Sequence, residues 1–255
     1  MQTGVTATRP TCSMRGMARA VGGKFEIVYG FLSSLEIGDV RVQRVPVYIR
    51  RFHDSHVPID GFLGLSVITK FIATVDYGTN TFSLRRSSES SLNRESISST
   101  PISVPHSEVI EIPVRTTGSG FISGEIRVEG IEKPQNFIID TGASISVISE
   151  KLAEQEEMAG YLQKTRMRVF GAAGVADNVK LFLLPRVTLG PLARENVGAA
   201  VLDLGPINET SGFIQDGILG ANFLRHFRIS FDFQRGVIRL EPLRKTDRDA
   251  ETPKS

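Results

Sequence analysis

Short runs of alternating apolar and polar residues fill most of the chain, and they predict β-strands. Runs of about four to eight residues bounded by Gly, Asp or Pro are typical of strands. In the first part of the chain they cover 25–28, 35–37, 40–42, 45–49, 72–77 and 81–84. In the second part they cover 109–114, 121–128, 137–140, 167–175, 229–232 and 237–240. The pattern predicts an all-β fold with short helical stretches before Phe71, within 149–163 and before Phe227.

Three stretches lack this pattern and suggest how the chain is divided. Residues 1–16 are polar and rich in Thr and Gly, so we expect a poorly ordered leader. Residues 87–104 are rich in serine, which predicts a flexible linker. The charged tail, 246–255, is expected to be disordered. The linker therefore separates a first block at 1–86 from a second block at 105–245.

The two blocks contain similar sequences at a constant spacing, which indicates an internal repeat. Asp60-Gly61-Phe62-Leu63-Gly64 matches Asp216-Gly217-Ile218-Leu219-Gly220, 156 residues later. The same spacing places Phe71 on Phe227, Asp76 on Asp232 and Leu84 on Leu240, and Gly23 falls on Gly174 at a spacing of 151. At the spacing of 151, the counterpart of Asp140 would fall at position −11, before Met1, so the first block lacks its own Asp-Thr-Gly loop and the strands that flank it. We therefore expect the first copy to be incomplete.

Composition narrows the function only slightly. The chain has 255 residues and a formal net charge of +2, too small to favour nucleic acid or an anionic membrane as a partner. Cys12 is the only cysteine, and the four histidines show no spacing typical of metal ligands, so no metal and no cofactor is expected. No apolar run approaches the roughly 18 residues of a membrane span.

The main candidate for chemistry is the stretch Phe137-Ile138-Ile139-Asp140-Thr141-Gly142-Ala143-Ser144. A carboxylate at the end of an apolar strand is poorly solvated, so hydrogen bonds must hold it or a proton must neutralise it. Gly142 allows a tight turn that brings backbone N–H groups toward the acid. An ordinary strand-to-turn junction would also contain Asp and Gly, so the tripeptide alone is weak evidence of catalysis.

Two further segments give the second block a resemblance to the retropepsin-like aspartic proteases. The Asp140-Thr141-Gly142 loop resembles their active-site loop, and Ile218-Leu219-Gly220 with the helical residues after it resembles the segment that packs beneath that loop. A hairpin with a small-residue tip is similar to their substrate-binding flap; its residues are Phe170, Gly171, Ala172, Ala173 and Gly174. The resemblance implies two retropepsin-like (acid protease) β-barrel lobes, the first incomplete, and an endopeptidase that acts on a peptide or protein.

The family's chemistry requires two carboxyl groups, and this chain offers one Asp-Thr-Gly. A homodimer could bring two copies of Asp140 together around a twofold axis. The second acid could instead belong to sequence that completes the first block. A third interpretation is a non-catalytic module for peptide binding or self-association. Asp60, Asp76, Asp216 and Asp232 are expected to make turns or to satisfy local backbone groups.

Overall fold

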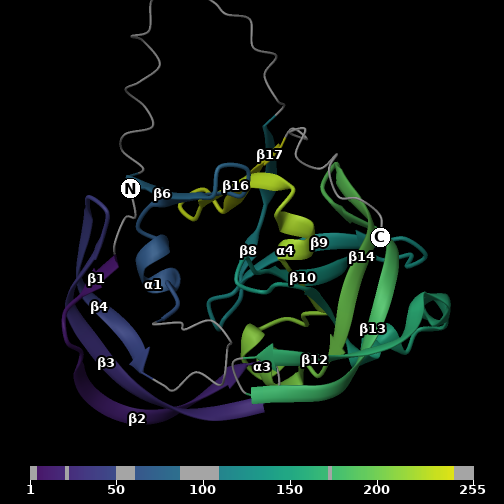
Figure 1. The fold of residues 1–255 in the computed structure, drawn as a ribbon, viewed down its shortest axis with the longest axis horizontal. Coiled ribbons are helices and arrows are strands. Elements are labelled where there is room, and N and C mark those ends of the chain that lie inside the picture. Colours follow the sequence, from purple (N-terminus) through teal and green to yellow (C-terminus); the bar gives the residue numbers. More distant parts are fainter. Residues whose placement is uncertain (1–4, 21–22, 50–60, 87–108, 172–173, 244–255) are drawn as a thin grey trace, which may run out of the picture.

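The computed structural model describes residues 5–20, 23–49, 61–86, 109–171 and 174–243. It confirms the all-β fold: three sheets contain most of the described residues, and the helices are short. The first block contributes a four-stranded sheet and the second an eight-stranded one, and a five-stranded sheet contains strands from both (Figure 1). The division at 1–86, 87–104, 105–245 and 246–255 remains a prediction, because the linker lies mostly outside the described residues.

The first sheet is organised around one long strand, β3, which pairs with all three of the others. Its members are β1 (Val5–Ala7), β2 (Thr11–Ala20), β3 (Gly23–Ile37) and β4 (Val40–Ile49). The expected disordered leader is therefore wrong from Val5 onward, because two strands form there by pairing with β3. The hairpin of β2 and β3 curves along the bottom of the molecule toward the second block (Figure 1).

The second block is built on an eight-stranded sheet with the order β12-β13-β14-β11-β15-β10-β9-β8, in which β13 also pairs with β9. Its strands are β8 (Arg115–Thr116), β9 (Ile122–Val128), β10 (Gln135–Ile139), β11 (Ser146–Ser149), β12 (Leu162–Gly171), β13 (Gly174–Leu189), β14 (Leu192–Leu202) and β15 (Gly217–Leu219). β15 lies between β10, to which it runs parallel, and β11, to which it runs antiparallel. This arrangement places the loop that joins β10 to β11 across the end of β15.

A five-stranded sheet joins the two blocks in the order β6-β5-β16-β17-β7. Its strands are β5 (Ile72–Asp76), β6 (Thr81–Arg85), β7 (Ile110–Pro113), β16 (Phe227–Asp232) and β17 (Val237–Pro242). β5 and β16 pair antiparallel around Thr74 and Ser230, whose hydroxyl oxygens are 2.8 Å apart. These residues are 156 positions apart, the spacing of the predicted repeat. Matching strands of the two blocks thus meet at matching residues, which supports the repeat.

The helices are single turns or little more. The elements are α1 (Leu65–Ile68), α2 (Glu150–Ala153), the 3₁₀ helix η2 (Glu156–Tyr161), α3 (Gly205–Ser211) and α4 (Ala221–Leu224). Two of them, α1 and α4, follow the matching glycines Gly64 and Gly220. The helical predictions near 65–71, 149–163 and 221–227 are confirmed. Within the described residues, no helix is long and apolar enough to span a membrane.

The main hydrophobic core lies in the second block and continues into the shared sheet. Phe137, Ile148, Leu219 and Phe223 are fully buried there. A smaller core in the first block surrounds Leu35, Val45 and Phe71. Because Leu219 and Phe223 flank Gly220, the larger core directly supports the segment beneath the Asp140 loop.

Candidate functional site

The Asp140 loop begins where β10 ends and is fixed to the neighbouring strand by its backbone. Asp140 N–H donates to the carbonyl oxygen of Leu219 at 3.1 Å, which continues the β10–β15 pairing by one residue. Ala143 N–H donates to the carbonyl oxygen of Asp140 at 3.3 Å and closes the turn. The apolar strand predicted before the acid therefore exists, and it places the carboxyl at the end of a buried sheet.

The Asp140 carboxylate faces into its own loop and accepts backbone hydrogen bonds. Gly142 N–H donates to Asp140 Oδ1 at 2.8 Å. Burial raises the pKa of Asp140 above its ordinary value, and the backbone N–H groups of Gly142 and Ala143 partly oppose that rise. Because burial has the larger effect, the carboxyl holds a proton more readily than an exposed aspartate does. A group of this kind is suited to acid–base chemistry.

A hydrogen-bonded network beneath the loop centres on Asn222 and Ser146. Asn222 Oδ1 accepts from Ser146 N–H at 2.9 Å and from the Ser146 hydroxyl at 2.8 Å. Asn222 Nδ2 donates to the carbonyl oxygen of Gly198 at 2.7 Å, and Gly220 N–H donates to Ser146 Oγ at 3.1 Å. The network ties β11, β14 and α4 together and so holds the strand that leaves the Asp140 loop.

At Gly220, the backbone lies so close to the Asp140 loop that there is no room for a side chain. A Cβ atom at Gly220 would lie 2.6 Å from the backbone of Ile145 and 2.9 Å from the carbonyl oxygen of Ala143. Ala221 N–H donates to that same carbonyl at 2.7 Å. Glycine at this position therefore allows the Ile218-Leu219-Gly220 segment to lie directly beneath the loop, as the sequence resemblance implied.

The other predicted site residues lie partly within the described chain. Thr141 is half-buried and Gly142 is exposed at the turn. Gly171 pairs with Gly174 where β12 meets β13, so the predicted hairpin exists, and Phe170 is exposed beside its tip. Ala172 and Ala173 lie outside the described residues. The flap function of these residues remains a prediction.

Among the described residues, no second carboxylate contributes to the pKa shift of Asp140. Asp76 and Asp232 accept backbone hydrogen bonds in their turns, as expected. Asp216 does not make a turn: it leads into β15, where Asp216 Oδ2 accepts from Asn136 N–H at 3.1 Å. Asp60 lies outside the described residues.

Sequence reasoning missed Tyr77, a first-block residue near the acid. It is half-buried against the main core. Burial raises the pKa of its hydroxyl, and the negative charge of Asp140 raises it further. The first block therefore reaches the neighbourhood of the Asp140 loop. The sequence signal that could have placed Tyr77 near Asp140 is its position directly after β5, a strand of the shared sheet.

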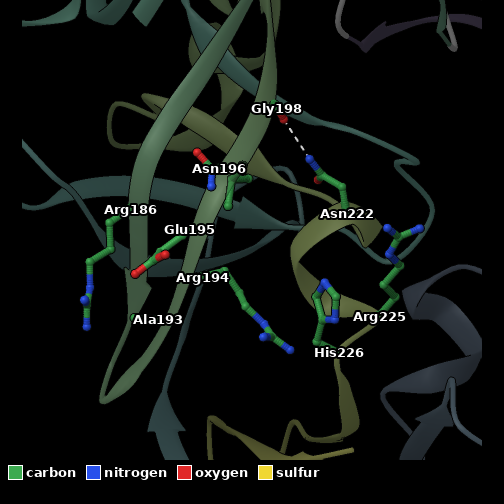
Figure 2. Close-up of a pocket in the computed structure, with 10 residues that line it drawn as sticks. Arg186, Ala193, Arg194, Glu195, Asn196, Gly198, Asn222, Arg225 and His226 are labelled. Carbon is green, nitrogen blue, oxygen red and sulfur yellow. Dashed lines mark hydrogen bonds between the residues drawn. The ribbon is translucent and has the colours of Figure 1, made fainter. Parts of the chain in front are cut away.

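A cavity of about 570 Å³ has several cationic side chains in its lining. Figure 2 shows the side chains of Arg194, Arg225 and His226 on one side of it and Arg186 beside Glu195 on the other. Asn222 belongs to the wall and reaches Gly198, so the cavity borders the supporting network. Asp140 does not line it.

Comparison with known proteins agrees with this geometry. Residues 124–223 match the family model described as aspartyl protease, a range that contains the Asp140 loop, the hairpin and the segment beneath the loop. No curated protein matches the chain. An aspartic proteinase from Irpex lacteus is 15% identical and covers 93% of this chain and 82% of its own, with a TM-score of 0.52. A retropepsin-like aspartic protease from Rickettsia conorii is 21% identical and covers 53% of this chain and 92% of its own, with a TM-score of 0.38. At these identities, the first of the two structures supports the fold alone.

Proposed function

We propose that the chain hydrolyses peptide bonds with Asp140 as one member of an aspartic dyad, a proposal supported by the match of residues 124–223 to the aspartyl protease family model. The observation that supports this proposal most is the environment of the Asp140 carboxyl group. Its carboxyl lies at the end of a buried strand, held by Gly142 N–H, with a raised pKa.

The proposed mechanism uses two carboxyl groups that share one proton, because two adjacent carboxylates cannot both ionise easily. The ionised member takes a proton from water, and the water oxygen attacks the scissile carbonyl. The protonated member donates a hydrogen bond to the carbonyl oxygen as negative charge develops there. Asp140 would fill one of these roles, and Thr141 and Gly142 would shape the loop that holds it. The hairpin tip at 170–174 would cover the bound peptide.

Among the described residues of a single chain, no second acid contributes to the pKa shift of Asp140, so the dyad needs a further source. A homodimer that used the β16 edge of the second block would have to displace β5, which already pairs with that edge. We therefore favour a second acid supplied by polypeptide that completes the first block. Tyr77 supports this choice, because it already carries the first block close to Asp140.

The test is proteolysis of a mixed peptide library by the purified chain, alone and after mixing with candidate partner polypeptides. Asp140→Asn should abolish every cleavage that the wild type makes, and pepstatin-type inhibitors should suppress it. Asp216→Asn is the matched control, because Asp216 is also a partly buried carboxyl but lies at the opposite end of the β10–β15 pair. Cleavage that survives in Asp140→Asn would refute the proposal.

A second candidate function is non-catalytic peptide binding or self-association. The observation that favours it is the lack of a second carboxylate near Asp140 among the described residues. This alternative predicts that peptides bind to wild type and Asp140→Asn with equal affinity. It also predicts that neither protein cleaves them, whatever partner is added.

A further inference from the structure

The cavity of about 570 Å³ collects more cationic than anionic side chains. Arg194 comes from β14, and Arg225 and His226 directly follow α4 (Figure 2). The pairing of β13 with β14 places Arg186 opposite Glu195, which is the one carboxylate among the described residues of the lining. Within the described part of the chain, Arg194 and Arg225 make no ion pair. The lining therefore carries positive charge that the protein does not balance.

Arg194 holds a hydrogen-bond donor that lacks an acceptor. Its guanidinium carbon lies 5.5 Å from the centre of the ring of Phe227, a buried side chain. The Nε atom of Arg194 is shielded from solvent and has no hydrogen-bond partner among the described residues. A buried N–H group without an acceptor is costly, and native structures usually provide one. An anion in the cavity would supply the acceptor and would offset the positive charge of Arg194.

The charge and size of the cavity indicate which anion would fit. A guanidinium presents its N–H groups in a planar fork that matches two oxygens of a carboxylate or a phosphate. Three arginines and one glutamate give the lining a formal charge of +2 when the histidine is neutral. A phosphate monoester balances this charge with about −1.5 to −2, whereas a carboxylate supplies half of it. The volume of about 570 Å³ is typical of small-ligand sites and leaves room for the group that carries the phosphate.

We propose that this cavity binds a phosphate monoester group. Arg194 donates to the phosphate through the fork that includes Nε, and Arg225 adds a second guanidinium at the end of α4. Asn222 also lines the cavity and donates to the Gly198 carbonyl, so the bound group lies next to the network beneath the Asp140 loop. Asp140 itself does not line the cavity, so the proposal does not depend on hydrolysis.

The first test is isothermal titration calorimetry of the full chain at constant ionic strength, with inorganic phosphate and acetate as probes. Phosphate should bind more tightly than acetate. Arg194→Met should weaken phosphate binding by at least about tenfold, because it removes hydrogen bonds to a charged acceptor. Arg194→Lys keeps the charge but loses the fork, so its affinity should lie between those of Arg194→Met and the wild type.

The matched control is Arg85→Met, which removes the same charge from an exposed position at the end of β6, outside the cavity. It should bind phosphate as the wild type does. Thermal unfolding without phosphate should show that all three variants are folded. Amide NMR shifts on binding should centre on Arg194, Gly198 and Asn222.

Two further probes distinguish the sources of the phosphate group. Glycerol 3-phosphate represents small phosphorylated molecules, and a blocked tripeptide with a central phosphoserine represents phosphorylated polypeptides. At least one should bind more tightly than inorganic phosphate, and the tighter one identifies the source. The proposal is overturned if phosphate binds no more tightly than acetate, or if neither ester binds more tightly than inorganic phosphate. It is also overturned if Arg194→Met binds as the wild type does, if Arg85→Met weakens binding equally, or if the shifts centre on Asp140 and Gly142.

Discussion

The two blocks place the same sequence pattern in different surroundings. Gly64 and Gly220 begin matching helices with nearly the same backbone angles, φ −94° and ψ 177° against φ −98° and ψ −176°. A Cβ atom at Gly220 would collide with the Asp140 loop, whereas one at Gly64 would meet nothing within 4 Å. The local backbone of the two segments is therefore the same, and among the described residues a loop packs over the second segment and not over the first.

Burial changes in the same way between matching residues. Ile218 is 6% exposed because β15 lies between β10 and β11, whereas its counterpart Phe62 is 67% exposed. The shared sheet shows the same contrast at its ends, where Ile238 of β17 is 0% exposed and its match Phe82 of β6 is 43% exposed. The comparison teaches that a strand sequence alone does not make a core position. A neighbouring strand must also cover it.

The largest expected loss of stability is in β17, the strand of the shared sheet that pairs with β7. Ile238→Ala should lower the free energy of unfolding by about 2–5 kcal/mol, because it leaves a cavity among fully buried side chains. Phe82→Ala, its match, should cost less than about 1 kcal/mol because much of the ring is already in water. Urea denaturation measures both. Equal losses at the two sites would contradict the contrast in burial between Ile238 and Phe82.

Substitutions at the matching glycines, Gly220 and Gly64, should give the next largest difference in stability. Gly220→Ala should cost about 1–3 kcal/mol or more, since the added Cβ must displace the backbone of Ile145 and Ala143. Gly64→Ala should stay within about 1 kcal/mol of the wild type, because only the cap preference changes. Thermal unfolding of both variants checks this. A tolerant Gly220 would mean that the loop does not lie where the structure places it.

The network beneath the loop predicts a smaller difference. Asn222→Ala should cost about 1–3 kcal/mol, because it removes the acceptor of the Ser146 hydroxyl and backbone N–H and the side-chain donor to the Gly198 carbonyl. Ser66, the matching residue, makes one exposed hydrogen bond to the Pro46 carbonyl at 3.5 Å, so Ser66→Ala should have almost no effect. Chemical denaturation and amide exchange at Ser146 measure the difference.

The same comparison shows how much the sequence could predict. The hairpins at 72–77 with 81–84 and at 229–232 with 237–240 could be predicted because their turns are local. The Asp140 loop could be predicted because a buried strand, an acid and a glycine stand together in the sequence. β1 and β2 could not, because their Thr- and Arg-rich residues become strands only by pairing with β3.

Other misses have similar causes. α3 was missed in a polar stretch, although Pro206 in its first turn was a usable start signal. The partner of Asp216 is Asn136, 80 residues earlier, and the nearness of Tyr77 to Asp140 depends on the shared sheet. Contacts between distant residues of this kind leave no local pattern in the sequence.

The smallest effect concerns the ion cluster where β17 pairs with β7. Hydrogen bonds from Arg235 and Arg239 lower the pKa of Glu111 to about 2. Because the pKa of Glu111 is lower in the folded protein than its ordinary value of 4.5, Glu111 stabilises the fold at pH values above 4.5. This stabilisation is lost as the pH falls toward about 2. Glu111→Gln should therefore lower the urea midpoint slightly at neutral pH and have no effect near pH 2. Glu36→Gln, which removes an exposed ion pair with Arg41 in the first block, is the control.

The most direct test of the account is NMR titration of the Asp140 carboxyl carbon in the isolated chain. We predict one titration step, with a pKa above the ordinary value for an aspartate, because the group is desolvated and no described carboxylate faces it. Two coupled steps would show that a second acid is already present beside Asp140. A single step at or below the ordinary value would show that the loop does not bury this carboxyl, and the account of the site would be wrong.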